Sequence, residues 1–318
     1  MNISFFCDHH YYGQLNNTGG TRTILLSADA LRILGHKVSV VATHDGFTWF
    51  KHQKPVPKIP KDADVVIAVS ISDVPLVMEK AKGKRMAYWA RPFETWAMSE
   101  HDIIHLLKKF RKKGGIIMAN SSWPVEVLRE HGVKAHVQFA GTATDEFVVP
   151  EYVLRSQYPK NHDDGCVGCQ YSKLPRKKFK DFKKLHKILG AHGEYVAFGN
   201  GSYSKPWLEY VKQPSHKALQ ELYWDCDYFF APNKLEGYYN AASQAALSGC
   251  VIVRSASARG GMGDWSTDRN SIVYRSLGEA AERIRAREVP PEWKDCRQRV
   301  LAIGTRLDNM KKMAERLS

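Results

Sequence analysis

The sequence has no long hydrophobic run and few cysteines. No apolar stretch in its 318 residues reaches the ~20 residues that a transmembrane helix needs. Its first residues lack the basic start and long apolar middle of a signal peptide. The six cysteines are scattered apart from Cys166 and Cys169, and no second pair stands at zinc spacing. We therefore expect a cytoplasmic protein with reduced thiols and no metal centre.

Acidic residues are scarce relative to basic ones. Thirty-three Asp and Glu face 47 Lys and Arg, which gives a formal net charge of +14. Such an excess favours an anionic partner, and nucleic acid, an anionic membrane surface and a charged glycan all qualify. Two basic clusters stand out, one at residues 108–113 and one at residues 176–187. Cations at a helix C-terminus explain part of the first cluster, and contact with phosphates would explain the rest.

The chain alternates short apolar strands with helical patterns, which indicates an α/β fold with parallel sheets. Its length suits two domains. We place an N-terminal domain at residues 1–155, with a linker within 150–161, and a second domain at residues 156–295. Residues 292–318 read as a long terminal helical region, of which 296–318 forms the last element. No internal repeat or low-complexity segment is present.

The stretch from Tyr228 to Val253 reads as strand, loop, helix and strand. It places Glu236 at the carboxyl end of a strand and beside the N-terminus of a helix starting at Asn240. Ligands bind at this edge of open α/β sheets, and anions bind where the first helical N–H groups are unpaired. The alternative is an ordinary buried helix with a solvent-facing glutamate.

This stretch resembles the signature of the family-4 retaining glycosyltransferases, which have the GT-B fold. Glu236-Gly237-Tyr238 and Gly249-Cys250-Val251 match the signature, whereas Gln244 stands where the family has a second glutamate. Gln244 can still accept and donate hydrogen bonds. The resemblance implies two Rossmann-like domains that face a cleft, with the C-terminal helix crossing back onto the first domain.

Weaker motifs follow in the order that the family has them. Gly19-Gly20 precedes a helix that closes at Gly35-His36, Pro175-Arg176-Lys177 follows a strand, and Gly199-Asn200-Gly201 follows the next. The resemblance implies that the donor is bound by Gly19, Gly20, Lys173, Arg176, Lys177, Gly199, Gly237, Tyr238, Asn240 and Gln244. The family's arginine directly after the first strand's glycine is absent, and Lys173 or Arg176 would replace it.

The resemblance also implies catalytic residues and an acceptor site. Glu236 would hold the hydroxyls of the transferred sugar, and Arg91 and Glu94 occupy the region where the family often has a histidine. A salt-bridged loop is the alternative for that pair. Residues expected to contact the acceptor are His9, His10, Trp96, Lys109 and Lys112. Adjacent histidines on a strand end point to opposite sides, so His9 and His10 would not chelate one ion easily.

The predicted function is transfer of a sugar from a nucleotide-diphosphate sugar, a UDP-sugar being the commonest choice, with retention of configuration. No tightly bound cofactor and no metal are expected. The basic charge favours a hydroxymethylated pyrimidine in DNA as acceptor, as in phage enzymes acting in the host cytoplasm. An enzyme of cell-envelope polysaccharide or glycolipid synthesis is one alternative. A non-catalytic basic nucleic-acid-binding protein is another. The donor sugar and the oligomeric state stay open.

Overall fold

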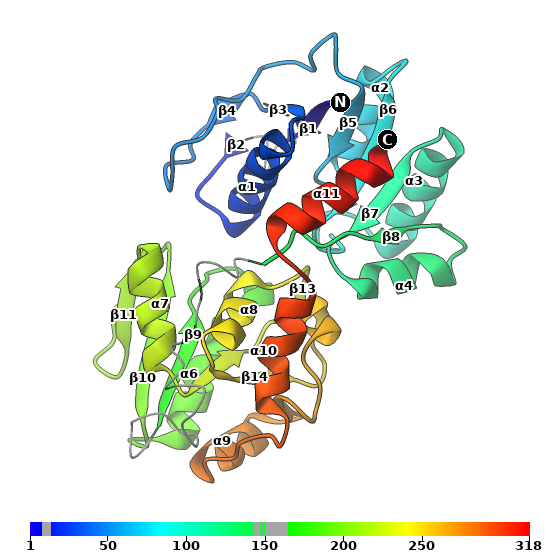
Figure 1. Ribbon diagram of the computed structural model, residues 1–318. Helices are drawn as coiled ribbons and strands as arrows, with labels where there is room; N and C mark the ends of the chain where they lie inside the picture. Colours follow the sequence, from blue (N-terminus) through cyan, green and yellow to red (C-terminus); the bar gives the residue numbers. More distant parts are fainter. Residues whose placement is uncertain (8–13, 143–146, 148, 150–164) are drawn as a thin grey trace. The chain divides into compact units, whose positions relative to one another are not determined.

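The computed structural model describes residues 1–7, 14–142, 147, 149 and 165–318 (Figure 1). The chain divides into two compact units. Unit 1 comprises Met1–Gly141 together with Thr305–Ser318, and unit 2 comprises Thr142–Gly304. Within the described residues, no helix is long and apolar enough to cross a bilayer.

Unit 1 is built on a six-stranded parallel sheet in the order β3-β1-β5-β6-β7-β8. Its strands are β1 (Asn2–Phe6), β3 (Lys37–Val41), β5 (Val65–Ala68), β6 (Arg85–Ala90), β7 (Ile116–Ala119) and β8 (His136–Val137). Its helices are α1 (Gly19–Ile33), α2 (Asp73–Lys80), α3 (Glu100–Lys112), α4 (Ser122–Glu130) and α11 (Arg306–Leu317). A small pair, β2 (Gln14–Leu15) and β4 (His44–Asp45), completes the unit.

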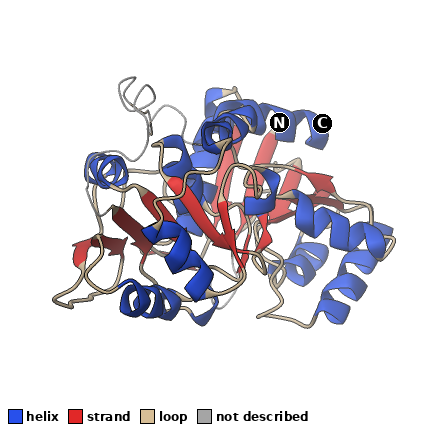
Figure 2. Cartoon of the chain, turned by 90° about the horizontal axis from the view of Figure 1, so that it is seen from below, coloured by secondary structure: helices blue, strands red, loops and turns tan. Residues whose placement is uncertain are grey.

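Burial on both faces explains the apolar strands of unit 1. Helices lie on both sides of the strands (Figure 2). All four residues of β5 are buried, as expected for a parallel strand covered on both faces. At the start of α1, the Thr18 hydroxyl accepts the backbone N–H of Thr21 at 3.1 Å and so caps the helix. β8 is short, because only His136 and Val137 pair with β7.

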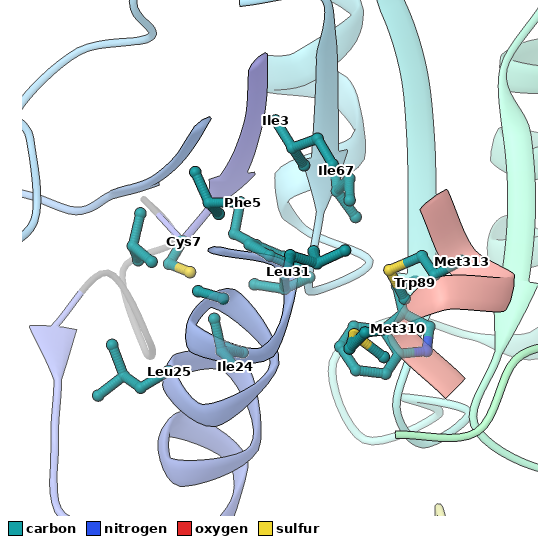
Figure 3. Packing of buried hydrophobic residues seen from close by; sticks show 14 of the residues in the cluster. Ile3, Phe5, Cys7, Ile24, Leu25, Leu31, Ile67, Trp89, Met310 and Met313 are labelled. Carbon is teal, nitrogen blue, oxygen red and sulfur yellow. The ribbon is translucent and has the colours of Figure 1, made fainter. Parts of the chain in front are cut away.

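The end of the chain belongs to unit 1. Met310 and Met313 of α11 are buried in the same cluster as Ile24 of α1 and Trp89 of β6 (Figure 3). Residues 292–318, predicted as one long helical region, form two helices, α10 (Trp293–Ala302) and α11. Gly304 interrupts them with a φ of 89°, and a capping box of Thr305 and Asp308 then starts α11.

Unit 2 has a second six-stranded parallel sheet, in the order β11-β10-β9-β12-β14-β16. Its strands are β9 (Cys166–Gln170), β10 (Glu194–Gly199), β11 (Glu209–Lys212), β12 (Tyr228–Ala231), β14 (Val251–Ser255) and β16 (Ile272–Tyr274). Its helices are α6 (Phe179–Leu189), α7 (His216–Asp225), α8 (Asn240–Leu247), α9 (Leu277–Arg285) and α10. β11 was not predicted, because an edge strand that is largely solvent-accessible lacks a continuous apolar run.

Candidate functional site

The candidate site of unit 2 lies where its central strands end. Parallel strands bring their carboxyl ends to one edge of the sheet, the usual ligand edge of open α/β folds. The 3₁₀ helix η1 (Pro175–Lys177) follows β9, and β13 (Leu235–Glu236) follows β12. β15 (Arg259–Gly260) and the 3₁₀ helix η2 (Gly261–Asp264) follow β14. Of the residues predicted for the site, these short segments carry Arg176, Lys177 and Glu236.

Lys177 and Glu236 form the centre of this site. The Lys177 Nζ lies 2.5 Å from the Glu236 Oε1, and both side chains are largely buried, with 15% and 14% of their surface exposed. Asn233 Nδ2 donates a hydrogen bond to the same Glu236 oxygen at 3.2 Å. The lysine also stands over the Tyr239 ring, 4.8 Å from its centroid. An ammonium and a carboxylate are thus held side by side at the ligand edge of the sheet.

Backbone pairing holds the Glu236 segment in place. β13 pairs with β15 so that Leu235 faces Arg259 and Glu236 faces Gly260. Beyond this pair, the Gly261 N–H donates to the Gly237 carbonyl at 2.5 Å. A Cβ on Gly260 would lie 1.7 Å from the Glu236 carbonyl oxygen, and Gly260 has a φ of +118°. Only glycine fits where these two backbone segments approach so closely.

The residues after Gly237 turn sharply into α8. Tyr239 adopts a left-handed conformation with a φ of 60° and precedes Asn240, the first residue of the helix. Tyr238 is buried, and burial raises the pKa of its phenol above the usual range. Gln244 is 9% exposed, and its Oε1 accepts a hydrogen bond from the Tyr223 hydroxyl at 3.5 Å. Tyr239 connects this helix to the Lys177–Glu236 pair, because it directly precedes α8 and its ring lies under the Lys177 ammonium. The N-terminus of α8, a favourable place for an anion, is therefore next to the pair.

Glycines also allow two segments to approach closely at the ends of β9 and β10. A Cβ on Gly199 would lie 2.6 Å from the Tyr171 carbonyl oxygen, and one on Gly201 would lie 2.9 Å from the Tyr171 ring. Lys173 is exposed, with its Cε 3.8 Å from that same Gly201 position. The rings of Tyr171 and Tyr203 pack 5.0 Å apart. This end of the site therefore combines an aromatic surface with a cation.

Arg176 links the two halves of the site. Its carbonyl oxygen accepts the Lys234 N–H at 3.2 Å, which ties η1 to the segment leading into β13. The Lys177 ammonium also acts on Cys169 near the end of β9. Burial raises the pKa of the Cys169 thiol well above its usual range, and the positive charge of Lys177 offsets a smaller part of that rise. The sequence reasoning missed Asn233, Tyr239 and Gly260, although the positions of Asn233 and Tyr239 next to Glu236-Gly237 offered a signal.

In unit 1, the structure brings Gly20 and Arg91 together at the start of α1. A Cβ on Gly20 would lie 2.6 Å from the Arg91 Nη1, whereas one on Gly19 would meet nothing within 4 Å. The Arg91 Nε and Nη2 donate to the Val69 carbonyl at 3.2 and 3.1 Å, which fixes the guanidinium beside the ends of β5 and β6. A cation and a helix N-terminus therefore converge at the ligand edge of this sheet.

The other predicted residues of unit 1 are dispersed. Glu94 is only 4% exposed, and its carboxylate accepts the backbone N–H of Ile71, so it supports the loop after β5 from within. Trp96 is exposed, and Lys109 and Lys112 are exposed on α3. His9 and His10 lie outside the described residues. Among the residues that the structure does describe, no three His, Cys, Asp or Glu side chains gather as a metal site requires.

Neither family models nor curated protein sequences match this sequence. Solved structures do match its fold. Sucrose-phosphate synthase from Thermosynechococcus elongatus superposes with a TM-score of 0.75 at 12% identity, covering 99% of this chain and 98% of that one. HepE from Anabaena, in complex with UDP and glucose, gives 0.78 at 12% identity, covering 100% and 99%. A glycosyltransferase from Rickettsia africae ESF-5 gives 0.73 at 12% identity, covering 99% and 97%.

These matches extend over nearly the whole length of both partners. They confirm the prediction of a GT-B fold built from two Rossmann-like units with parallel sheets. At this level of identity the likeness concerns the fold, and function has to be argued from the side chains of the site itself.

Proposed function

We propose that the protein is a retaining glycosyltransferase that transfers a sugar from a UDP-sugar to an acceptor hydroxyl. The observation that carries the proposal is the Lys177–Glu236 pair, held at the ligand edge of the unit 2 sheet. The fold adds support, because HepE, which shares it, has been solved with UDP-glucose. The donor is a co-substrate, and the proposed reaction uses neither a bound cofactor nor a metal.

The proposed chemistry follows from the charges of the site. The acceptor hydroxyl oxygen bonds to the anomeric carbon as the bond to the β-phosphate oxygen breaks. The electron pair leaves with the diphosphate, which takes up the hydroxyl proton. Lys177, Arg176 and the N-terminus of α8 stabilise the charge that develops on the diphosphate. Glu236 orients the sugar hydroxyls, while Tyr171 and Gln244 contribute to holding the nucleoside.

For the acceptor, we propose a hydroxymethylated pyrimidine in DNA. The net charge of +14 supports it, as do the exposed lysines at the end of α3. α3 contributes Lys108, Lys109 and Lys112 to the surface, with Lys113 directly after it. Cations that contact DNA phosphates release counterions, so we expect binding to weaken steeply with salt. The target base would be extruded from the duplex to reach the donor.

The decisive experiment offers a panel of radiolabelled nucleotide sugars to hydroxymethylated DNA, unmodified DNA and a lipid extract. Label in the hydroxymethylated DNA alone establishes the acceptor and identifies the donor, and the anomeric coupling constant of the product tests retention. Label in the lipid fraction instead assigns the enzyme to envelope synthesis. Binding of DNA without transfer or donor hydrolysis would identify a non-catalytic nucleic-acid-binding protein.

The contribution of unit 1 can be tested at two adjacent glycines. We expect Gly20→Ala to reduce sugar transfer roughly tenfold, because the new methyl group displaces the Arg91 guanidinium from the start of α1. The melting temperature should hardly change, since the obstructing atom is the end of a flexible side chain. Gly19→Ala is the comparison, because a Cβ there meets no protein atom within 4 Å, so any loss of activity at Gly19 reports contact with the donor and not displacement of Arg91. Equal activity of the two variants would exclude a role for Arg91.

A further inference from the structure

Backbone hydrogen bonds hold a loop of unit 1, residues 46–56, to β2 at its start and to the edge strand β3 at its end; we call it the Trp49 loop. At its start, the Gly46 N–H donates to the Leu15 carbonyl at 2.8 Å. At its end, the Val56 N–H donates to Val40 at 2.9 Å, and Val56 accepts the Ala42 N–H at 3.1 Å. Loops closed in this way present their central residues on a defined surface.

The Trp49 loop lies next to the candidate site of unit 1. Asn17 Nδ2 donates to the Thr48 hydroxyl at 2.8 Å, and the Thr48 N–H donates back to Asn17 Oδ1 at 2.9 Å. Asn17 precedes the Thr18 cap and the Gly19–Gly20 start of α1, where Arg91 stands. These two hydrogen bonds tie the loop to the segment that begins α1.

Trp49 forms a supported aromatic surface on this loop. Its side chain is 38% exposed, whereas Phe47 behind it is buried, with ring centroids 5.5 Å apart. Phe47 in turn packs against Phe50 at 4.8 Å and against His52 at 5.5 Å. The His52 Nε2 lies 3.0 Å from the Asp45 Oδ2. Because Phe47 already supports the indole, stacking of a ligand on Trp49 requires little further loss of side-chain conformational entropy.

The charge around Trp49 has one sign. Residues 46–61 contain four lysines and no aspartate or glutamate. Lys51, Lys54 and Lys58 are all exposed. The nearest acid before the loop, Asp45, is already paired with His52. An aromatic ring flanked by lysines matches single-stranded nucleic acid, in which bases stack on rings and ammonium groups contact phosphates.

An anionic membrane is the competing partner for such a surface. Interfacial segments bury a broad apolar face among the lipids. Within residues 46–58, all of which the structure describes, Trp49 is the only large apolar side chain exposed to solvent to this extent. One ring among lysines suits a stacked base better than a lipid interface.

We propose that the Trp49 loop is the acceptor-binding element of unit 1. One unpaired base stacks on Trp49, and Lys51 and Lys54 contact the flanking phosphates. The inference rests on the proposed nucleic-acid acceptor and adds the residues that hold it. None of these side chains belongs to the candidate donor site, so the loop would select the acceptor independently of the donor.

The test compares Trp49→Ala with Trp49→Phe, using fluorescence anisotropy of a labelled single-stranded oligonucleotide at fixed salt. We expect Trp49→Ala to weaken binding roughly tenfold or more and Trp49→Phe to retain most of it. The combined Lys51→Gln and Lys54→Gln variant should lower the slope of log affinity against log salt by about 1.4, from ~0.7 per contact. UDP binding measured by calorimetry should be unchanged in every variant, which also checks folding.

The outcomes separate this inference from the proposed function. If the wild type transfers sugar to DNA and Trp49→Ala binds the oligonucleotide equally well, the loop inference is wrong and the function stands. If the wild type binds no single-stranded oligonucleotide yet transfers sugar to hydroxymethylated duplex DNA, the loop inference fails and the proposed function stands. If it does neither, both fail. Binding to phosphatidylserine vesicles that Trp49→Ala abolishes, with oligonucleotide binding unaffected, would overturn the inference in favour of a membrane surface.

Discussion

Lys177→Ala should lower the rate of sugar transfer about 10²–10³-fold, the usual effect of removing one group that stabilises developing charge. The ammonium is 15% exposed, held between the Glu236 carboxylate and the Tyr239 ring. It is therefore oriented before the donor binds and needs no rearrangement as the diphosphate departs. Steady-state kinetics with saturating UDP-sugar would measure the effect on kcat, because loss of affinity alone would appear in KM.

Lys178→Ala is the matched control for this substitution. The Lys178 Nζ lies 3.7 Å from Asp181 Oδ2 and is more exposed than Lys177. The Lys178 side chain is 34% exposed, and a single ion pair with a partly solvated lysine contributes about 1 kcal/mol or less to stability. We expect transfer by Lys178→Ala to stay within about threefold of the wild type. A comparable loss in both variants would mean that general positive charge, rather than the position of Lys177, supports the reaction.

Loss of folding has to be separated from loss of chemistry at Lys177. Removing the lysine leaves Glu236 largely buried without its cation, which we expect to cost about 3 kcal/mol, the lower end for breaking a buried pair. The double variant Lys177→Ala with Glu236→Gln removes that unpaired charge. Its melting temperature should recover while its transfer rate stays low. Recovery of transfer in the double variant would contradict the catalytic role of Lys177.

The apolar strands and the location of Glu236 could be predicted from the sequence, because local patterns determine both. The run Tyr228–Phe230 reads as a buried strand, and the structure extends it to Ala231. Glu236 follows it at the edge of the sheet. The ion-pair partner of Glu236 could not be predicted in the same way. Lys177 reaches it only because β9 and β12 are neighbours in the sheet, a tertiary pairing that no local pattern encodes.

Two further features show where sequence reasoning ends. Glu94 was predicted to line the site because it occupies the region where the family often has a histidine, yet its carboxylate turns inward and accepts the Ile71 N–H. Residues 259–264 are rich in glycine, a composition typical of a flexible loop, yet Gly260 belongs to β15 and Gly261 begins η2. In both cases the outcome depends on a backbone group from another segment, so composition alone gives no indication of it.

The same glycines give the second large expected effect. Gly260→Ala should abolish most transfer activity, at least 10²-fold, because the Glu236 backbone would have to move. The new Cβ would lie 1.7 Å from the Glu236 carbonyl oxygen, and this neighbour is backbone that cannot rotate away. Alanine also disfavours the φ of +118° at this position. We expect a loss of about 3 kcal/mol in the free energy of unfolding.

Gly263→Ala is the control for this prediction, because it lies in the same loop and a Cβ there meets nothing within 4 Å. A thermal melt and a transfer assay on both variants separate the two effects. At ~2–4 °C per kcal/mol, Gly260→Ala should melt about 6–12 °C lower, and Gly263→Ala should match the wild type. If Gly260→Ala kept full transfer activity below its melting temperature, the position of the Glu236 backbone would not govern the reaction. Glu236 would then lose its proposed role in holding the sugar.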